Sequence, residues 1–531
     1  MPRTVEIRGR SAAPGLAAGP VFTIGMPAGG ATRDPAGLTG DDLSAAIAAA
    51  AAELAMLAER VEGEGADILS FQVALLEDSA LTDPARERIA AGEDAVSAWR
   101  ATLDGEIDGY RNSDNDYFRA RAGDLADLRD RVLGHLLGVP AAAVPAGAVL
   151  VGEDITPSRF LAMDWTKGGG IALSAGSPTS HVAILARSRG VPMLIGLGPL
   201  DAAGHRTAIV DGEAARLILS PDAAAWAALE AGRAARDERA REESEVLHRP
   251  ALTADGVPVG VFINVADPDE LAGIDPATCD GIGLVRTEFF FHGRGGSPSE
   301  EEQLAAYRRI VAWAAGRPVT FRTLDAGGDK PIAGLTIEGE SNPFLGTRGI
   351  RLSLARPDVF RLQLRALARV AAEGNVKVML PMVTIPEEID AAAALLDEAL
   401  AELGREGVPA RRPSLGIMVE VPAVAVEPEL FARAAFFSIG SNDLTQYVTA
   451  AARDISAVAP LCDPAHPAVI GLIRRVARTG AEIGRDVSLC GDMGGDPAHI
   501  PALVRAGLRS VSVAPPFVGR TKLAIAAART A

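Results

Sequence analysis

The sequence is poor in cysteine, in positive charge and in long apolar runs, and each shortage excludes a class of protein. Three cysteines in 531 residues, Cys279, Cys462 and Cys490, stand far apart without a Cys-x-x-Cys pair, so neither a disulfide framework nor a cysteine zinc site is expected. The 52 basic and 69 acidic residues leave a net charge of −17, which disfavours non-specific binding to nucleic acid and to anionic membranes. Residues 1–10 have no apolar signal core, and the alanine-rich run 45–52 is too short to span a bilayer. The sequence therefore predicts a soluble, cytoplasmic protein with no nucleic-acid partner and no membrane insertion.

The sequence is rich in periodic apolar patterns, and the period changes along the chain. Residues up to 23 predict a strand and a turn, and apolar residues recur at three- and four-residue steps over 41–136, which predicts about four helices in a small bundle. Over 140–220, short apolar runs separated by Gly and Pro predict an α/β unit. Residues 226–248 are rich in Ala, Arg and Glu, and they predict an exposed connecting helix. A chain of this length is expected to form about two to four domains.

The last part of the chain repeats a strand-helix rhythm. Eight short apolar runs are separated mostly by helical stretches, which is the pattern of a (β/α)8 barrel. The runs cover residues 257–265, 283–287, 319–324, 376–383, 415–421, 436–440, 487–489 and 510–514. In that fold the chemistry lies at the carboxyl ends of the strands.

Polar residues occur at the ends of these runs, where a barrel would bring them together. They are Arg286, Arg322, Glu420, Asn442, Asp443 and Cys490. Taken singly, each is more often a surface ion pair, a helix cap or a small buried residue. As a set, two arginines suit phosphate and carboxylate, two carboxylates suit Mg²⁺, and a thiol can donate a proton. The set predicts a site for a small phosphorylated carboxylic acid.

His181 stands where a strand-like run gives way to a short helix. The strand ends within 170–173, Thr179 or Ser180 is a suitable N-cap, and the apolar run 182–186 continues as helix. Free backbone N–H groups at such a helix start stabilise an anion, and a neutral imidazole is a competent nucleophile. A lone histidine is more often an ordinary helix residue, but the barrel site supplies a phosphoryl donor and favours His181 as the acceptor.

Several long blocks of the sequence resemble Enzyme I of the bacterial phosphotransferase system, the phosphoenolpyruvate-protein phosphotransferases. The blocks are residues 283–289, 322–330, 342–348 and 437–447, with Leu75-Leu76-Glu77-Asp78 and Thr179-Ser180-His181 in the same order. The resemblance implies transfer of the phosphoryl group of phosphoenolpyruvate to His181 and then to a histidine of an HPr-type carrier, with release of pyruvate. It implies that phosphoenolpyruvate is bound by Arg286, Arg322, Asn442, Asp443 and Arg453, in a mouth that also holds Arg348 and Lys330. It further implies Mg²⁺ on Glu420 and Asp443, and Cys490 as the group that protonates the enolate.

The resemblance also implies a multidomain α/β fold with a division of labour. A swivelling phosphohistidine domain would comprise residues 1–23 and 140–225, with a helical carrier-binding domain, residues 24–139, inserted into it. A linker helix, residues 226–250, would lead to a phosphoenolpyruvate-binding TIM barrel, residues 251–531. The family further implies a homodimer through the barrel.

The chain departs from the family pattern near both sites. Before the histidine, the usual Thr-Asp and Gly-Gly-Arg are replaced, at positions that include Leu173, Ser177 and Pro178. Near the barrel site the substituted residues are Ala452, Ile455 and Asp492. None is a residue with an implied chemical role, so an active enzyme is expected.

Two alternatives remain open at this point. One is a non-catalytic, regulatory relative, favoured by the altered surroundings of His181. The other is an ATP-using enzyme like pyruvate phosphate dikinase. The second is disfavoured because the roughly 140 residues before the α/β unit are helical and lack a glycine-rich phosphate loop.

Overall fold

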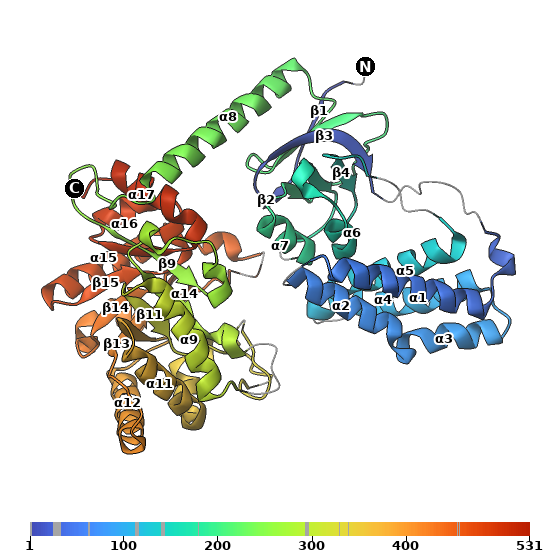
Figure 1. Ribbon diagram of the computed structural model, residues 1–531. Coiled ribbons are helices and arrows are strands. Elements are labelled where there is room, and N and C mark those ends of the chain that lie inside the picture. Colours follow the sequence, from blue (N-terminus) through green and yellow to red (C-terminus); the bar gives the residue numbers. More distant parts are fainter. Residues whose placement is uncertain are drawn as a thin grey trace. The chain divides into compact units, whose positions relative to one another are not determined.

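The computed structural model divides the chain into two compact units, Met1–Arg236 and Asp237–Ala531 (Figure 1). It describes residues 3–24, 33–61, 64–111, 116–139, 144–178, 180–291, 297–328, 330–337, 339–453, 455 and 457–530. The division falls within helix α8 (Ala223–Val246), the predicted connecting helix, whose one buried residue among the described ones is Leu229. Within the described ranges, no helix combines the length and the apolar character that a membrane span requires.

The first unit is built on a mixed sheet that has eight strands in the described residues, in the order β1-β8-β7-β3-β4-β5-β6-β2. The strands are β1 (Val5–Arg8), β2 (Arg10–Ala13), β3 (Leu16–Thr23), β4 (Val149–Gly152), β5 (Gly170–Leu173), β6 (Met193–Ile195), β7 (Thr207–Asp211) and β8 (Arg216–Leu219). Strands β3, β4, β5 and β6 are parallel neighbours, and β4 and β5 are almost wholly buried, as expected of strands covered on both faces. Where one strand and a turn were predicted before residue 23, the chain makes three strands.

A helical bundle interrupts this sheet between β3 and β4. The described residues of the bundle form α1 (Gly40–Ala58), α2 (Glu64–Glu77), α3 (Ser79–Ala90), α4 (Ala95–Arg111) and α5 (Asp116–Leu137). Because β3 and β4 are neighbouring parallel strands, the bundle is an insertion into the α/β unit, which confirms that part of the predicted fold. The prediction of about four helices missed α3. All residues of this helix are described; it contains Pro84, and its buried side chains are the small ones of Thr82 and Ala85.

The bundle and the α/β unit share one apolar core. Leu43 of α1 and Trp99 of α4 belong to the same buried cluster as Phe160 of α6 (Pro157–Leu161) and Val182 of α7 (His181–Ser188). The segment that begins at His181 is therefore anchored by packing, with Val182 4% exposed.

The second unit is a closed parallel barrel, as predicted. Its strands in the described part of the chain are β9 (Gly260–Val265), β10 (Ile282–Arg286), β11 (Val319–Arg322), β12 (Val376–Leu380), β13 (Ser414–Val419), β14 (Phe436–Ile439), β15 (Asp486–Leu489) and β16 (Ser510–Val513). Each strand pairs in parallel with the next, and β16 closes the barrel on β9. Each predicted run overlaps one strand, which confirms the (β/α)8 barrel.

The barrel strands are joined by helices, except where a short turn suffices. The α-helices are α9 (Glu300–Ala314), α10 (Ile350–Ala355), α11 (Pro357–Ala371), α12 (Pro386–Glu406), α13 (Pro422–Val426), α14 (Ser441–Thr449), α15 (Pro467–Glu482), α16 (Ile500–Arg505) and α17 (Val518–Ala527). Their apolar faces cover the barrel, as Leu364 and Leu367 of α11 show, both 0% exposed. The carboxyl ends of the strands are thereby held as one rigid rim.

Candidate functional site

A cavity of about 470 Å³ opens at the carboxyl ends of the barrel strands. We call it the mouth cavity. Its polar lining includes Arg286, Arg322, Lys330, Glu420, Asn442, Asp443, Arg453, Cys490 and Asp492. These side chains come from β10, β11, β13, β14 and β15 or from the segments that follow them, which meet at the carboxyl-terminal face of the barrel. The structure thus brings together eight of the residues predicted for the barrel site.

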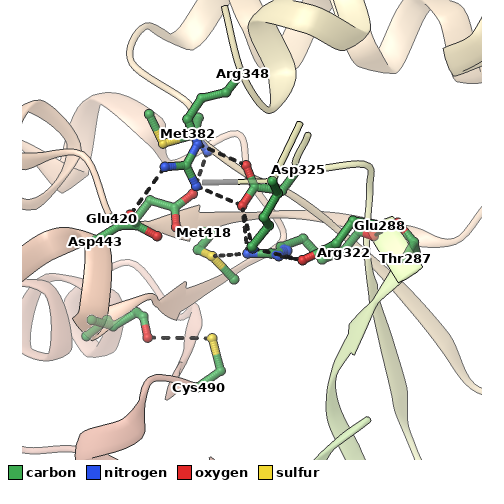
Figure 2. Close-up of polar contacts among 12 residues, drawn as sticks. Thr287, Glu288, Arg322, Asp325, Arg348, Met382, Met418, Glu420, Asp443 and Cys490 are labelled. Carbon is green, nitrogen blue, oxygen red and sulfur yellow. Dashed lines mark hydrogen bonds and ion pairs between the residues drawn. The ribbon is translucent and has the colours of Figure 1, made fainter. Parts of the chain in front are cut away.

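The cations on one side of the cavity are neutralised by two buried carboxylates. Arg322 donates to Glu288, and its Nη1 lies 3.1 Å from Asp325 Oδ2. Lys330 Nζ lies 2.9 Å from Glu288 Oε1 and 3.6 Å from Asp325 Oδ2. Burial by itself would lower the pKa of Arg322, but Glu288 and Asp325 outweigh it and raise that pKa. The guanidinium is therefore held charged and fixed in place at the cavity wall (Figure 2).

Arg348 lies behind this wall, with its side chain 0% exposed. Its Nη2 lies 2.9 Å from Asp325 Oδ2, and its Nη1 lies 3.3 Å from Asp443 Oδ1 and 3.4 Å from the Tyr447 hydroxyl. Tyr447 in turn donates to the carbonyl of Phe344. Arg348 therefore joins the carboxylate that supports Arg322 to the carboxylate that lines the cavity.

Glu420 and Asp443 form the acidic side of the cavity. Glu420 is 1% exposed; its Oε1 accepts the Met382 N–H at 2.6 Å, and its Oε2 has no hydrogen-bond partner among the described residues. Burial, then Asp443 and Asp325, raise the pKa of Glu420 to about 8. Met382 has a φ of +59°, a strained value for a residue with a side chain, and this places its N–H toward Glu420.

This acidic pair fits a divalent cation. An orphaned carboxylate oxygen facing a second carboxylate is costly unless a proton or a cation compensates it. The residues that the structure describes contain no group of three or more His, Cys, Asp or Glu side chains placed to hold a metal. Two carboxylates are nevertheless a usual protein contribution to Mg²⁺, which takes its other ligands from water and from substrate phosphate.

Cys490 follows β15 at the base of the cavity and is 3% exposed. Its sulfur accepts a hydrogen bond from Ser438 Oγ at 3.4 Å, and the thiol donates to the carbonyl of Ile439 at 3.6 Å. Burial raises the pKa of this thiol, so it holds its proton. A Cβ added at Gly491 would lie 1.9 Å from Ser441 Oγ, so the turn after Cys490 depends on glycine.

Asn442 and Asp492 face each other across the rim of the cavity. Asn442 Nδ2 donates to Asp492 Oδ2 at 2.9 Å, and the Asp492 N–H donates to Asn442 Oδ1 at 3.0 Å. The backbone N–H of Arg453 donates to Gln446 Oε1 at 3.3 Å, at the end of α14. The substitution at Asp492 therefore leaves a paired amide and carboxylate in the lining.

His181 lies in the first unit, as the first residue of α7, and it is half-buried. Of the two predicted N-caps, Ser180 caps the helix, since its side chain accepts the Ala183 N–H at 3.2 Å, and Thr179 lies outside the described residues. Arg187 links the loop before His181 to strand β2, since its Nη1 donates to the carbonyls of Pro178 and Ala12 at 2.9 and 2.8 Å.

Comparison with known proteins decides the family. The model of the PEP-binding domain of PEP-utilising enzymes matches residues 240–530, and the models of their N-terminal and mobile domains match residues 8–121 and 144–215. A phosphoenolpyruvate-protein phosphotransferase of Geobacillus stearothermophilus is 38% identical over 89% of this chain and 84% of its own. The chain belongs to the phosphoenolpyruvate-protein phosphotransferase family. A relative of the same name from Priestia megaterium is 35% identical over 96% of this chain and 92% of its own. The resemblance seen in the sequence is confirmed, and the protein is an enzyme, a phosphotransferase.

In this phosphotransferase, the residues near His181 that depart from the family pattern have different structural roles. Leu173 is 0% exposed and belongs to the apolar core, so its side chain serves packing and offers no hydrogen bond. Ser177 is exposed, and its carbonyl accepts the Ser180 N–H at 3.2 Å. Pro178 presents its carbonyl to Arg187.

The sequence reasoning missed the carboxylates that hold the cations of the mouth cavity. Glu288 and Asp325 are both 0% exposed, and each contacts Arg322 and Lys330. Both lie within the sequence blocks that resemble the family, Glu288 two residues after the end of β10 and Asp325 three residues after the end of β11. Their position at the carboxyl ends of barrel strands was the signal that could have identified them.

Proposed function

We propose that the mouth cavity binds phosphoenolpyruvate, and that its phosphoryl group passes to His181 and then to a histidine of an HPr-type carrier protein, with release of pyruvate. One observation carries this proposal: a single cavity joins fixed cations, two carboxylates and a buried thiol in a chain of this family. A volume of about 470 Å³ accommodates a phosphorylated three-carbon acid.

The cations bind and orient the substrate. Arg286, Arg322 and Arg453 line the cavity and supply forked donors that suit phosphate and carboxylate, with Asn442 as a neutral donor. Arg322 is held by two carboxylates, so it needs little reorganisation when the substrate arrives. Lys330 adds a point charge at the same wall.

Glu420 and Asp443 are the residues that would hold Mg²⁺. When bound, Mg²⁺ neutralises charge on the transferring phosphoryl group and helps to orient it. Arg348 contributes through Asp443, since its Nη1 lies 3.3 Å from Asp443 Oδ1 and fixes one oxygen of that carboxylate. We therefore assign Arg348 a positioning role in the anion-binding mouth.

Cys490 delivers the proton that converts the enolate of pyruvate to pyruvate. The raised pKa of this thiol keeps it protonated until the enolate forms, and its sulfur lines the cavity. The S–H bond breaks, a C–H bond forms at the methylene carbon, and the thiolate remains.

His181 is the acceptor in the first unit. It opens α7, where the backbone N–H groups of the first turn lie, and these stabilise an added phosphoryl group. His181 and the mouth cavity belong to different units, so transfer requires that His181 enter the cavity. The proposed assignment is a phosphohistidine domain of residues 1–23 and 140–225, a carrier-binding domain of residues 24–139, a linker helix of residues 226–250 and a catalytic barrel of residues 251–531.

The bundle and the barrel each expose apolar side chains that could contact a partner protein. Met56 of α1 is 59% exposed and Phe71 of α2 is 41% exposed, which gives the bundle apolar surface for the carrier. On the barrel, Leu430 is 60% exposed and Val426 44%, in keeping with the homodimer that the family implies. With this substrate and carrier, we further propose the cytoplasmic location that the sequence predicts.

Radiolabelled phosphoenolpyruvate with Mg²⁺ tests the proposal. Wild-type protein is expected to acquire an acid-labile phosphoryl label and to release pyruvate, whereas His181→Ala acquires no label. His205→Gln is the matched control, because His205 bonds Ser220 at 2.9 Å in the same unit and is expected to leave labelling unchanged. Wild-type protein that takes no label would contradict the proposed activity, and label that persists in His181→Ala would contradict the acceptor.

A further inference from the structure

The barrel has a second cavity, at the end opposite to the mouth cavity. It measures about 490 Å³ and is lined by residues at the amino ends of the strands, among them Thr320, Lys377, Asp486 and Ser510, and by Ser488 further along β15. We call it the rear cavity. The side chain of Asp486 is 88% exposed, so the rear cavity reaches solvent. Hydroxyl and charged groups in a space of this size hold water.

A chain of hydroxyl groups crosses the barrel interior from the rear cavity to Cys490. Ser488 Oγ, in the lining of the rear cavity, donates to Ser438 Oγ at 3.1 Å. Ser438 Oγ, 1% exposed, donates to Cys490 Sγ at 3.4 Å. Ser438 and Ser488 are direct register partners on β14 and β15, and Cys490 follows Ser488 by two residues, so it shares its face. Both hydrogen bonds run toward the sulfur.

The side chain of Asn264 holds the backbone of Cys490 in place. Asn264 Nδ2 donates to the Cys490 carbonyl at 3.2 Å and to the Ser512 carbonyl at 3.3 Å, while Ser512 Oγ donates to Asn264 Oδ1 at 2.6 Å. Two neighbouring strands therefore fix the position of residue 490. Because Ser438 donates to the sulfur from the interior side, a proton has a defined route to the sulfur that does not pass through the mouth.

We propose that Ser488 and Ser438 form a proton relay that reprotonates Cys490 from water in the rear cavity after each turnover. The inference rests on the proposed function, in which Cys490 gives its proton to the enolate. The Cys490 thiolate then takes the proton of Ser438, Ser438 takes that of Ser488, and Ser488 takes one from water. The three transfers are concerted, so neither serine is left as an alkoxide, and the hydroxide formed is neutralised by the solvent. Ser488 and Ser438 are positioning residues that act through Cys490.

The relay gives Cys490 a source of protons while the mouth cavity is occupied. Cys490 is 3% exposed, and after proton transfer pyruvate still occupies the mouth in front of it. Water in that space would also compete with His181 for the phosphoryl group. A route through the barrel interior restores the thiol without admitting water to the reacting groups.

The test follows two isotopes through one half-reaction in deuterium oxide, using the full chain, Mg²⁺, phosphoenolpyruvate and carbon-labelled pyruvate. Carbon label that enters phosphoenolpyruvate counts each passage through phosphoryl transfer and back. Deuterium that enters the methyl group of pyruvate counts how often Cys490 has taken a solvent proton between passages. The ratio of deuterium uptake to carbon exchange reports reprotonation alone, because a slower enzyme lowers both equally.

For Ser488→Ala, the ratio is expected to fall by about tenfold while carbon exchange is retained. A positioned proton-transfer group usually contributes at least roughly 10²-fold to a rate. The expected effect is smaller here because water that enters the empty mouth still reaches the thiol. Ser488→Thr keeps the hydroxyl, has room for its methyl group in the rear cavity, and is expected to restore the ratio. Ser510→Ala is the matched control, since Ser510 lines the same cavity outside the relay.

The possible outcomes separate the relay from its premise. An unchanged ratio in Ser488→Ala overturns the relay and assigns reprotonation to the mouth cavity. Parallel loss of both isotope signals, not reversed in Ser488→Thr, also overturns it, since that pattern indicates a packing defect. If Cys490→Ala keeps wild-type carbon exchange and deuterium uptake, the proton-donor role of Cys490 is what fails.

Discussion

Binding of Mg²⁺ to the metal-free enzyme is expected to release protons from Glu420. Its pKa of about 8 means that the carboxyl group is mostly protonated at neutral pH, whereas a metal ligand must be deprotonated. With that pKa, release per bound ion is ~0.9 proton at pH 7, ~0.5 at pH 8 and ~0.1 at pH 9. The affinity for Mg²⁺ accordingly falls by about tenfold for each pH unit below 8.

The same raised pKa sets the sign of the pH dependence of stability. Glu420 favours the folded state fully below its unfolded pKa of 4.5, and this contribution is lost as pH rises through about 8. Bound Mg²⁺ reverses the effect, because it stabilises the ionised carboxylate. Metal-free protein is therefore expected to lose thermal stability between pH 5 and 8, and saturating Mg²⁺ to restore it.

Calorimetric titration of Mg²⁺ in two buffers of different ionisation enthalpy measures the proton count. Glu420→Gln is expected to abolish both the release and most of the affinity. Glu301→Gln is the control, since Glu301 is a surface carboxylate with a side chain 71% exposed. Release below about 0.3 proton at pH 7, or release that grows as pH rises, would refute the assignment of a proton to Glu420.

Three further variants probe the remaining contacts. Arg348→Leu leaves Asp443 without its partner in a buried setting and is expected to cost about 3–5 kcal/mol in urea unfolding, against about 0–1 for the exposed pair broken in Arg361→Leu; equal losses would contradict the buried network. Cys490→Ala is expected to slow pyruvate release in stopped-flow assays, and unchanged turnover would remove its role. Arg187→Ala frees the Pro178 carbonyl and is expected to slow labelling of His181 several-fold with the affinity for phosphoenolpyruvate unchanged; a changed affinity instead would show that the loop does not act on His181.

Much of the fold was predictable because its elements are local. Strands such as Val376–Leu380 and Phe436–Ile439 are short, mostly apolar runs that contain one polar residue each, Lys377 and Ser438, and such runs can be identified locally. Helix α3 was missed because its burial depends on neighbouring helices and on small side chains. Strand β1 pairs with β8, more than two hundred positions along the chain, through a register that no local pattern carries.

The sequence by itself determined the barrel, the family and the chemical inventory of the mouth cavity, because strand ends and motif blocks can be identified along the chain. The tertiary structure decided which groups face the cavity and which stand behind it. Arg348 and Arg322 carry the same charge, and the sequence does not separate their roles. In the structure Arg348 is buried and paired with Asp325 and with Asp443, 95 positions away, whereas Arg322 lines the cavity. The hydroxyl chain from Ser488 to Cys490 was likewise invisible, because a hydrogen bond between neighbouring strands depends on closure of the barrel and not on sequence spacing.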